Sequence, residues 1–201
     1  MFIYGGSGHS KVIIDCLESL NIQIDGIFDD DINIKNVFEF IMLGIYDRNY
    51  LIEKEIIIAI GNNKIRKEIS QKIFHKFGKI IHPSAMTQRH VSIGEGSVIF
   101  HNSIIQSNSI IENHVIINTR ASIDHDCIIH DFAHIGPGAI LCGSVEVGEG
   151  TLVGAGAIVI PNIKIGKWVT IGAGTVIIEN IPDYAVVVGN PGKIKNFIFN
   201  A

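Results

Sequence analysis

Every sixth residue from position 93 to position 177 is aliphatic, and this repeat restricts the possible folds more than any other feature of the sequence. Small or β-branched residues stand two positions earlier in most repeats, and alternate residues of a strand share one face. A six-residue period of this kind predicts a parallel β-helix, in which each short strand stacks on the strand one coil earlier. The repeated positions are Ile93, Ile99, Ile105, Ile111, Ile117, Ile123, Ile129, Ile135, Leu141, Val147, Val153, Val159, Ile165, Ile171 and Ile177.

We expect this aliphatic series to fill the interior of the β-helix. At about 1.5–3 kcal/mol for each fully buried side chain, it would be the main stabilising contribution over residues 91–180. Glycine follows the aliphatic residue in several repeats, where we expect a corner of the coil that adopts positive φ. These glycines are Gly94, Gly136, Gly148, Gly154, Gly166 and Gly172.

The repeat resembles that of the hexapeptide-repeat transferases, which implies a left-handed β-helix with three hexapeptides per coil. Residues 18 positions apart would then stack, and two of the outward columns are unusually apolar for a surface in water. Such stripes favour a partner surface, and the resemblance implies a homotrimer with active sites between subunits. The alternative is that isoleucine is present only because it favours strands. The two columns are Ile104, Ser122, Ile140, Ile158, Val176 and Val98, Ile116, His134, Leu152, Thr170.

The chain in front of the repeat alternates short apolar strands with helices. "MFIYGGSGHSKVIIDCLESL" predicts a strand, a glycine-rich turn and a helix over about residues 10–20, and "EIIIAIGNNKIRKEISQKIF" predicts a buried strand followed by an amphipathic helix. Pro83 in "IIHPSA" then prevents a helix from continuing. We therefore expect an α/β, Rossmann-like N-terminal domain over residues 1–82 and a left-handed parallel β-helix over residues 83–201.

The turn "GGSGHS" at residues 5–10 brings backbone N–H groups to the N-terminus of a helix, which suits a phosphate or pyrophosphate. Lys11 replaces the third glycine of the dinucleotide fingerprint, so a nucleotide sugar is favoured over NAD. The acidic residues 29–31, and then Gly61 and Asn62, follow strands at the edge where open α/β sheets bind ligands. A tight glycine turn and a solvated acidic turn are the alternative interpretations.

Charge and composition exclude several classes of function. A formal net charge of −4, without a run of Lys or Arg, gives no electrostatic case for nucleic acid or an acidic membrane surface. The apolar runs are much shorter than the roughly 20 residues of a membrane span. The first residues do not have the pattern of a signal peptide, so we expect a cytoplasmic protein. Three cysteines without a CxxC pair argue against a disulfide framework or a Cys-rich zinc site.

The segment "ASIDHD" at residues 121–126 interrupts the repeat with a histidine between two aspartates. An imidazole has a pKa of about 6.5, which suits a general base at neutral pH. Gly143 would lie one coil later, about 4.8 Å away, where its N–H could face a developing oxyanion. Asp126 or Asp124 could orient His125, but neighbours on a strand point apart, so this partnership requires a bent corner. A solvated turn histidine is the alternative.

Five stretches, "GGSGH", "FDDD", "HPSA", "NTRASIDHDCIIHDFAHIGPGAILCG" and "VVVGNPGK", together resemble the sugar-nucleotide acetyltransferases. These enzymes join a small nucleotide-binding domain to a β-helix, and they include enzymes acting on UDP-4-amino sugars, on perosamine and on sialic acid. The resemblance implies acetyl-CoA as co-substrate, no metal, and the amine of a UDP- or GDP-linked amino sugar as acceptor.

The resemblance also implies roles for single residues. His125 would remove a proton from the attacking amine, Asp126 would orient His125, and a Gly143 N–H would stabilise the oxyanion without an acyl-enzyme. Cys127 falls in the inward column of small residues, so we expect it in the core and not as a nucleophile. The remaining implied contacts are His134, Gly143, Ala155 and Ala173 with acetyl-CoA, Gly8, His9, Asp29 and Asp30 with the nucleotide, and Asn118 with the acceptor.

Two other classes of function stay open. His125 and His130 have a spacing seen in zinc sites, as in β-helical carbonic anhydrases, but Arg89 stands two coils before His125 and His90 is out of register, so a third ligand is missing. A non-catalytic sugar-nucleotide-binding scaffold would bind no CoA. Within the transferases, a sialic acid O-acetyltransferase and a GDP-perosamine N-acetyltransferase are the alternatives to a UDP-4-amino-sugar enzyme.

Overall fold

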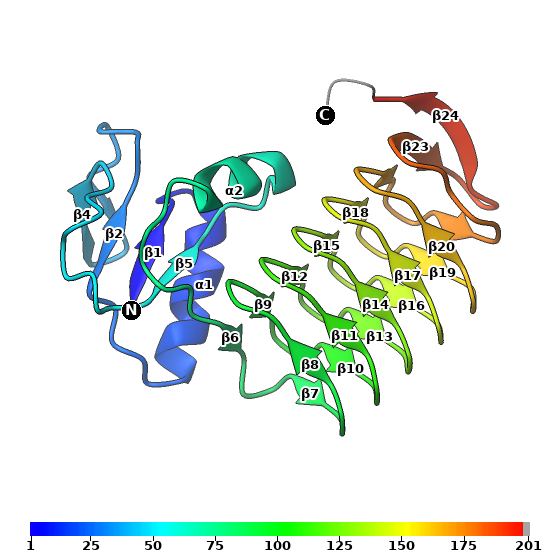
Figure 1. Ribbon diagram of the computed structural model, residues 1–201, viewed down its shortest axis with the longest axis horizontal. Helices are drawn as coiled ribbons and strands as arrows, with labels where there is room; N and C mark the ends of the chain where they lie inside the picture. The colour runs from blue at the N-terminus through cyan, green and yellow to red at the C-terminus, as the bar shows by residue number, and fades with distance from the viewer. Residues whose placement is uncertain (199–201) are drawn as a thin grey trace.

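The computed structural model describes residues 1–198 as an α/β part followed by a prism-shaped β-helix (Figure 1). In Figure 1 the helices of the α/β part lie next to the first coils, and the last strand lies at the far end of the β-helix. No helix within residues 1–198 is long and apolar enough to cross a membrane.

The α/β part contains a sheet with the strand order β3-β4-β2-β1-β5, in which β3 and β4 form an antiparallel pair and the other pairs are parallel. The strands β1, β2 and β5 are buried along their whole length because each is a short apolar run, as expected for parallel strands covered on both faces. The elements are β1 (Phe2–Tyr4), α1 (Gly8–Ser19), β2 (Gly26–Phe28), β3 (Asn36–Val37), β4 (Phe40–Gly44), β5 (Ile56–Ile58) and α2 (Asn63–Ser70).

The β-helix has three faces, each a sheet of very short strands. The first face contains β6 (Ile80–Ile81), β9 (Val98–Ile99), β12 (Ile116–Ile117), β15 (His134–Ile135), β18 (Leu152–Val153), β21 (Thr170–Ile171), β23 (Ala185–Val188) and the antiparallel β24 (Lys193–Phe197). The second face contains β7 (Met86–Thr87), β10 (Ile104–Ile105), β13 (Ser122–Ile123), β16 (Ile140–Leu141), β19 (Ile158–Val159) and β22 (Val176–Ile177). The third face contains β8 (Ser92–Ile93), β11 (Ile110–Ile111), β14 (Ile128–Ile129), β17 (Glu146–Val147) and β20 (Lys164–Ile165).

The strand register confirms the coil of three hexapeptides. Ile104 pairs with Ser122, and Ser122 pairs with Ile140, so each step along the second face advances 18 residues. The aliphatic series fills the interior as predicted: from Ile99 to Ile177 no member exposes more than 2% of its surface. Removing this apolar area from water is the main force that holds the coils together.

The glycines after the aliphatic residues have a different role from the one expected. The left-handed conformation occurs two residues later, for example at Gly138, Gly156 and Asp126. Gly136 and Gly154 instead lie against the backbone of the next coil, where an added Cβ would be 2.7 Å and 2.5 Å from a carbonyl oxygen. The expectation of positive φ at these positions was therefore wrong, because close approach between coils is what requires the missing side chain.

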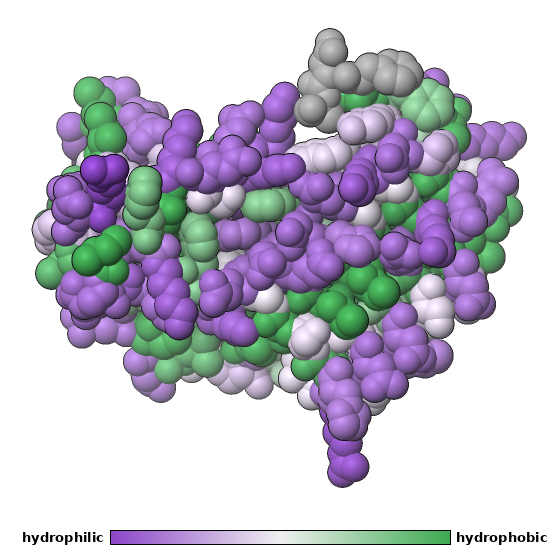
Figure 2. All heavy atoms as spheres, viewed as in Figure 1, coloured by the Kyte–Doolittle hydropathy of each residue, from purple (hydrophilic) through white to green (hydrophobic). Residues whose placement is uncertain are grey.

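One of the two apolar columns is covered by the chain itself. Val98 and Ile116 on the first face are 1% and 2% exposed, because they pack in a common core with residues of α1. A partner surface was the wrong interpretation for these two residues. The column on the second face stays open, with Ile140 at 42% and Ile158 at 38% exposure. Figure 2 shows apolar side chains in rows across the coils, between rows of hydrophilic ones.

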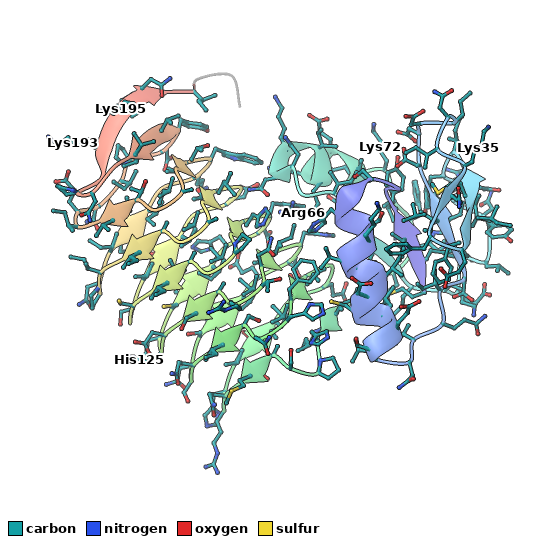
Figure 3. The ribbon with its side chains drawn as sticks, turned by 180° about the vertical axis from the view of Figure 1, so that it is seen from behind. Lys35, Arg66, Lys72, His125, Lys193 and Lys195 are labelled. Carbon is teal, nitrogen blue, oxygen red and sulfur yellow. The ribbon has the colours of Figure 1, made fainter. Side chains whose placement is uncertain are left out.

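A buried arginine joins the two parts. Arg66 on α2 is 1% exposed and lies between the helices and the coils (Figure 3). Its guanidinium donates to the carbonyl oxygens of His114 and Phe132 in the β-helix, at 2.9 Å and 2.7 Å, and to the carbonyl oxygen of Ile60 in the α/β part, at 3.0 Å. Because buried charges are costly unless their donors are satisfied, these bonds fix the position of the α/β part on the first face.

Candidate active site at a corner of the β-helix

His125 lies at the corner between the second and third faces, which we call the second corner (residues 124–127 and 142–145). The bend that the His125–Asp126 pair requires is present, because Asp126 adopts a left-handed conformation with φ of 59°. Its carboxylate turns back toward the ring, and Oδ2 lies 2.6 Å from Nδ1 of His125. Asp126 therefore orients the imidazole. Asp124 has another task, since its Oδ1 accepts a hydrogen bond from the backbone N–H of His125 at 2.8 Å.

The carboxylates around the ring make the imidazole of His125 a stronger base by raising its pKa. The hydrogen bond to Asp126, followed by the charge of Asp124, raises the pKa of His125. The same hydrogen bond, with a second one from Asn108, lowers the pKa of Asp126 and keeps its carboxylate ionised. With Nδ1 held by Asp126, Nε2 is the nitrogen that is available to take a proton.

Gly143 lies beside the ring, one coil later, as the coil length predicts. A Cβ added to Gly143 would lie 2.7 Å from Cε1 and 2.8 Å from Nε2 of His125, so only glycine leaves space over the basic nitrogen. The backbone N–H of Ser144 donates to the carbonyl oxygen of His125 at 2.9 Å and ties the two coils together. Within residues 1–198 the N–H of Gly143 makes no hydrogen bond, so it is free to meet an oxyanion.

The residues expected to hold a nucleotide lie around the carboxyl ends of β1 and β2. Gly8 is the first residue of α1, and Asp29 follows β2. Asp29 accepts hydrogen bonds from the backbone N–H groups of Gly6 at 2.6 Å and Asp31 at 2.8 Å, so its carboxylate shapes the glycine turn. Asp30 accepts a hydrogen bond from Tyr4, and this bond adds to burial in raising the pKa of that phenol.

His9 and His134 form a half-buried pair of rings where the α/β part meets the first face, with centroids 6.5 Å apart. Burial, aided by the charge of Arg66, lowers the pKa of His9 and of His134 to about 4, so both rings are neutral. Asn118 donates its amide to Nε2 of His134 at 3.0 Å, which places the ring proton on Nδ1, 3.3 Å from the carbonyl oxygen of Gly61. Nε2 of His9 is buried and has no partner within residues 1–198.

A pocket of about 370 Å³ opens next to this group. Gly61, Asn62 and His134 line it, together with Trp168 and Leu152 of the upper coils. The side chain of Asn62 also caps α2, since its Oδ1 accepts a hydrogen bond from the N–H of Ile65 at 3.0 Å. Residues predicted for the nucleotide and for acetyl-CoA therefore meet in one pocket on the first face.

The structure does not bring all the predicted residues together. Ala155 and Ala173 are exposed, one coil apart, at the corner between the first and second faces, which we call the first corner. His125, Asp126 and Gly143 lie at the second corner, away from Arg66 and from the helices of the α/β part (Figure 3). Within a single chain, the second face separates the basic imidazole from the other predicted contacts.

The alternatives based on cysteine and metal chemistry have no support from the geometry. Cys127 is fully buried in the core as predicted, and burial raises the pKa of its thiol to about 11. His125 and His130 lie at different corners, and His130 contacts Glu112 and Glu146 instead. Within residues 1–198 no group of three or more His, Cys, Asp or Glu side chains could hold a metal ion.

Two residues that shape the site or its surroundings were not predicted from the sequence. Asn108 lies one coil before Asp126 and contacts its carboxylate, which the 18-residue spacing could have revealed. Arg66 gave no signal, because an arginine on an amphipathic helix is ordinarily a solvent-facing residue.

Known proteins resemble this chain in both the α/β part and the β-helix. Residues 1–73 match the family described as PglD N-terminal domain, and residues 126–159 and 144–179 match bacterial transferase hexapeptide (six repeats). GDP-perosamine N-acetyltransferase of Escherichia coli O157:H7 is 29% identical over 75% of this chain and 73% of its own length. UDP-N-acetylbacillosamine N-acetyltransferase of Bacillus subtilis is 37% identical over 48% of this chain. The matched segment spans about half of that relative, 49% of its length.

A solved structure extends the similarity to the whole chain. PerB from Caulobacter crescentus, in complex with CoA and GDP-perosamine, is 34% identical, with a TM-score of 0.91, over 97% of this chain and 96% of its own. The match includes both the α/β part and the β-helix. The chain belongs to the hexapeptide-repeat sugar acetyltransferase family.

Proposed function

We propose that this protein is an acetyl-CoA-dependent N-acetyltransferase that acylates the amine of a nucleotide-linked amino sugar in bacterial surface-glycan biosynthesis. The observation that carries the proposal is the second corner, where the His125–Asp126 pair faces the space that Gly143 leaves open. The α/β part supplies a place for the nucleotide. Both substrates of such a reaction are cytoplasmic metabolites, so we place the enzyme in the cytoplasm.

The proposed mechanism uses a direct transfer. Nε2 of His125 accepts a proton from the attacking amine while the amine nitrogen bonds to the thioester carbon. Asp126 stabilises the imidazolium that forms, and the free N–H of Gly143 stabilises the negative charge on the carbonyl oxygen. As the tetrahedral intermediate collapses, its C–S bond breaks, the departing CoA sulfur takes the proton from Nε2 of His125, and the amide remains. Cys127 takes no part, because its thiol is buried and protonated.

We further propose a homotrimer with active sites between subunits. The first corner, with Ala155 and Ala173, and the second corner, with His125, flank the same apolar second face. If three copies turn this face toward a threefold axis, the second corner of one subunit lies beside the first corner of the next. In this arrangement Ala155 and Ala173 would line the pantetheine arm of acetyl-CoA as it runs toward His125. His134 would contact acetyl-CoA from the first face.

For the acceptor we propose a UDP-4-amino-4,6-dideoxy sugar, with GDP-perosamine as the second candidate. In the α/β part, Gly8, His9, Asp29 and Asp30 would hold the nucleotide, and Gly61 and Asn62 line the pocket that His134 also lines. Asn118 would contact the sugar, because its amide donates to Nε2 of His134. The relatives named above acetylate amines, which favours N-acetylation over sialic acid O-acetylation.

The experiment is a thiol-release assay with acetyl-CoA and a panel of UDP- and GDP-linked amino sugars, with free sialic acid included. We expect turnover with a 4-amino sugar and none with sialic acid. His125→Ala should lower turnover by about 100-fold or more, the usual contribution of a general base. Turnover with sialic acid alone would mean that the accepting group is a hydroxyl and not an amine. Near-normal turnover of the His125→Ala variant would mean that His125 is not the general base.

A further inference from the structure

Asn108 and Asp126 occupy the same position at the second corner in successive coils. Both adopt the left-handed conformation, with φ of 63° and 59°. Asparagine and aspartate tolerate this region better than other residues that carry a Cβ. The backbone N–H of Asp126 donates to the carbonyl oxygen of Ser107 at 3.1 Å, which ties the two turns together and stacks the two side chains.

The two oxygens of Asp126 are divided between two neighbours. Oδ2 accepts from Nδ1 of His125 at 2.6 Å, and Oδ1 lies 3.3 Å from Nδ2 of Asn108. About half of the Asp126 side chain is exposed, at 51%, so the core does not restrict rotation of this carboxylate. Within residues 1–198 the Asn108 amide is therefore the contact that limits rotation of the Asp126 carboxylate away from the imidazole.

We propose that Asn108 is a positioning residue of this site: its side-chain amide holds Oδ1 of Asp126 so that Oδ2 stays aligned with Nδ1 of His125. The inference rests on the proposed function, since alignment matters only if His125 acts as a base. An amide suits this position because it donates a hydrogen bond without adding charge. A lysine would compete with the imidazole for the carboxylate, and an aspartate would repel it.

The substitution Asn108→Gly removes the amide and keeps the backbone conformation, because glycine adopts positive φ without cost. We expect kcat to fall by about threefold to tenfold, the effect of one hydrogen bond, while KM for both substrates stays within about twofold. Asn21→Gly is the matched control, since Asn21 has φ of 55° directly after α1 in the α/β part, away from the proposed site residues and from every corner of the β-helix. This control should keep the wild-type kcat.

A double-mutant cycle with Asp126 separates positioning from a structural effect. If Asn108 acts through the carboxylate, Asn108→Gly should lower kcat in the wild-type background and change nothing further in an Asp126→Ala background. An equal loss in both backgrounds, or no loss in the wild-type background, would overturn the proposal.

A variant that adds a negative charge at position 108 gives a readout that does not depend on catalysis. Asn108→Asp adds a third carboxylate beside the imidazole, next to Asp124 and Asp126, so the pKa of His125 should rise. An NMR titration of the His125 ring measures this shift directly, and an unchanged pKa would show that residue 108 is not in contact with the pair. If wild-type protein instead shows the expected titration but releases no thiol with any acceptor, the proposed function fails and the contact stands.

Discussion

At the scale of single residues, the second corner depends on a side chain that is absent. Gly143 adopts no left-handed conformation, so alanine would fit its backbone, yet the added Cβ would lie 2.7 Å from the imidazole. We expect Gly143→Ala to displace the ring of His125 and to lower kcat by about 100-fold, in the range seen when an oxyanion donor or base is lost. Steady-state thiol release measures this, and Ser144→Ala, one residue further on, should keep the wild-type rate.

The second residue-scale prediction concerns pH. A general base works when neutral, so kcat/KM should rise with pH through the pKa of His125, which Asp126 and then Asp124 raise. Asp126→Asn removes the larger of these effects, and the rising limb of the pH profile should move to lower pH with a lower plateau. A limb that stays at the wild-type pH would mean that another group controls the rate.

The sequence predicted part of this corner, and the reason is geometric. Stacking 18 residues apart places Gly143 next to His125 once the repeat is known. The spacing left both Asp124 and Asp126 open as partners of the ring, because sequence neighbours on a strand diverge, and the left-handed turn at residue 126 is what brings Asp126 to the imidazole. The neutral state of His134 depends on burial under a different domain, which no local pattern reveals.

At the scale of elements, an ionic contact joins successive coils on the third face. His130 follows β14, and its Nδ1 and Nε2 each lie 3.1 Å from a carboxylate, Glu112 after β11 and Glu146 on β17. Lys164 on β20 adds a further ion pair one coil later, with its Nζ 3.0 Å from the carboxylate of Glu146. Both ring nitrogens can donate only when the imidazole is protonated, so this contact links three coils in the charged state.

This contact predicts a dependence of stability on pH. Partial burial lowers the pKa of His130, but the hydrogen bonds to Glu146 and Glu112 outweigh it and raise the net value. The stabilisation is therefore complete below the pKa of the unfolded chain and is lost as pH rises through the raised folded pKa. Denaturant unfolding should show that His130→Gln destabilises the protein at about pH 5.5 and has a much smaller effect at about pH 9. An equal effect at both pH values would contradict the assignment.

Element boundaries followed from the sequence less well than element types. The period predicted the strands of the β-helix, because an aliphatic column must face a common interior. The prediction for the corners was wrong. The glycine after the aliphatic residue permits close packing between coils, whereas positive φ occurs two residues after that glycine position, often at Asn, Asp, Arg or His. Helix α1 begins at Gly8, two residues before the expected start, because Ser7 already supplies the extended residue that precedes a helix.

At the scale of the whole molecule, the second face decides whether the proposed site exists. We expect Ile140→Arg to place a charge in the contact between subunits, so that light scattering after gel filtration detects monomers and thiol release is lost. Ile110→Arg is the matched control, since Ile110 has the same exposure of 42% but lies on the third face. A trimeric, active Ile140→Arg variant would place the interface elsewhere, and circular dichroism checks that both variants fold.

The buried Arg66 has a consequence for substrate choice. Because one guanidinium holds carbonyl groups of both parts, a hinge movement between them would strand a charge in the interior. If the loops of the α/β part hold a nucleotide as proposed, their distance from the His125 of a neighbouring subunit is fixed. We therefore expect the enzyme to select its acceptor by length, and to reject an analogue with one phosphate fewer or one sugar more.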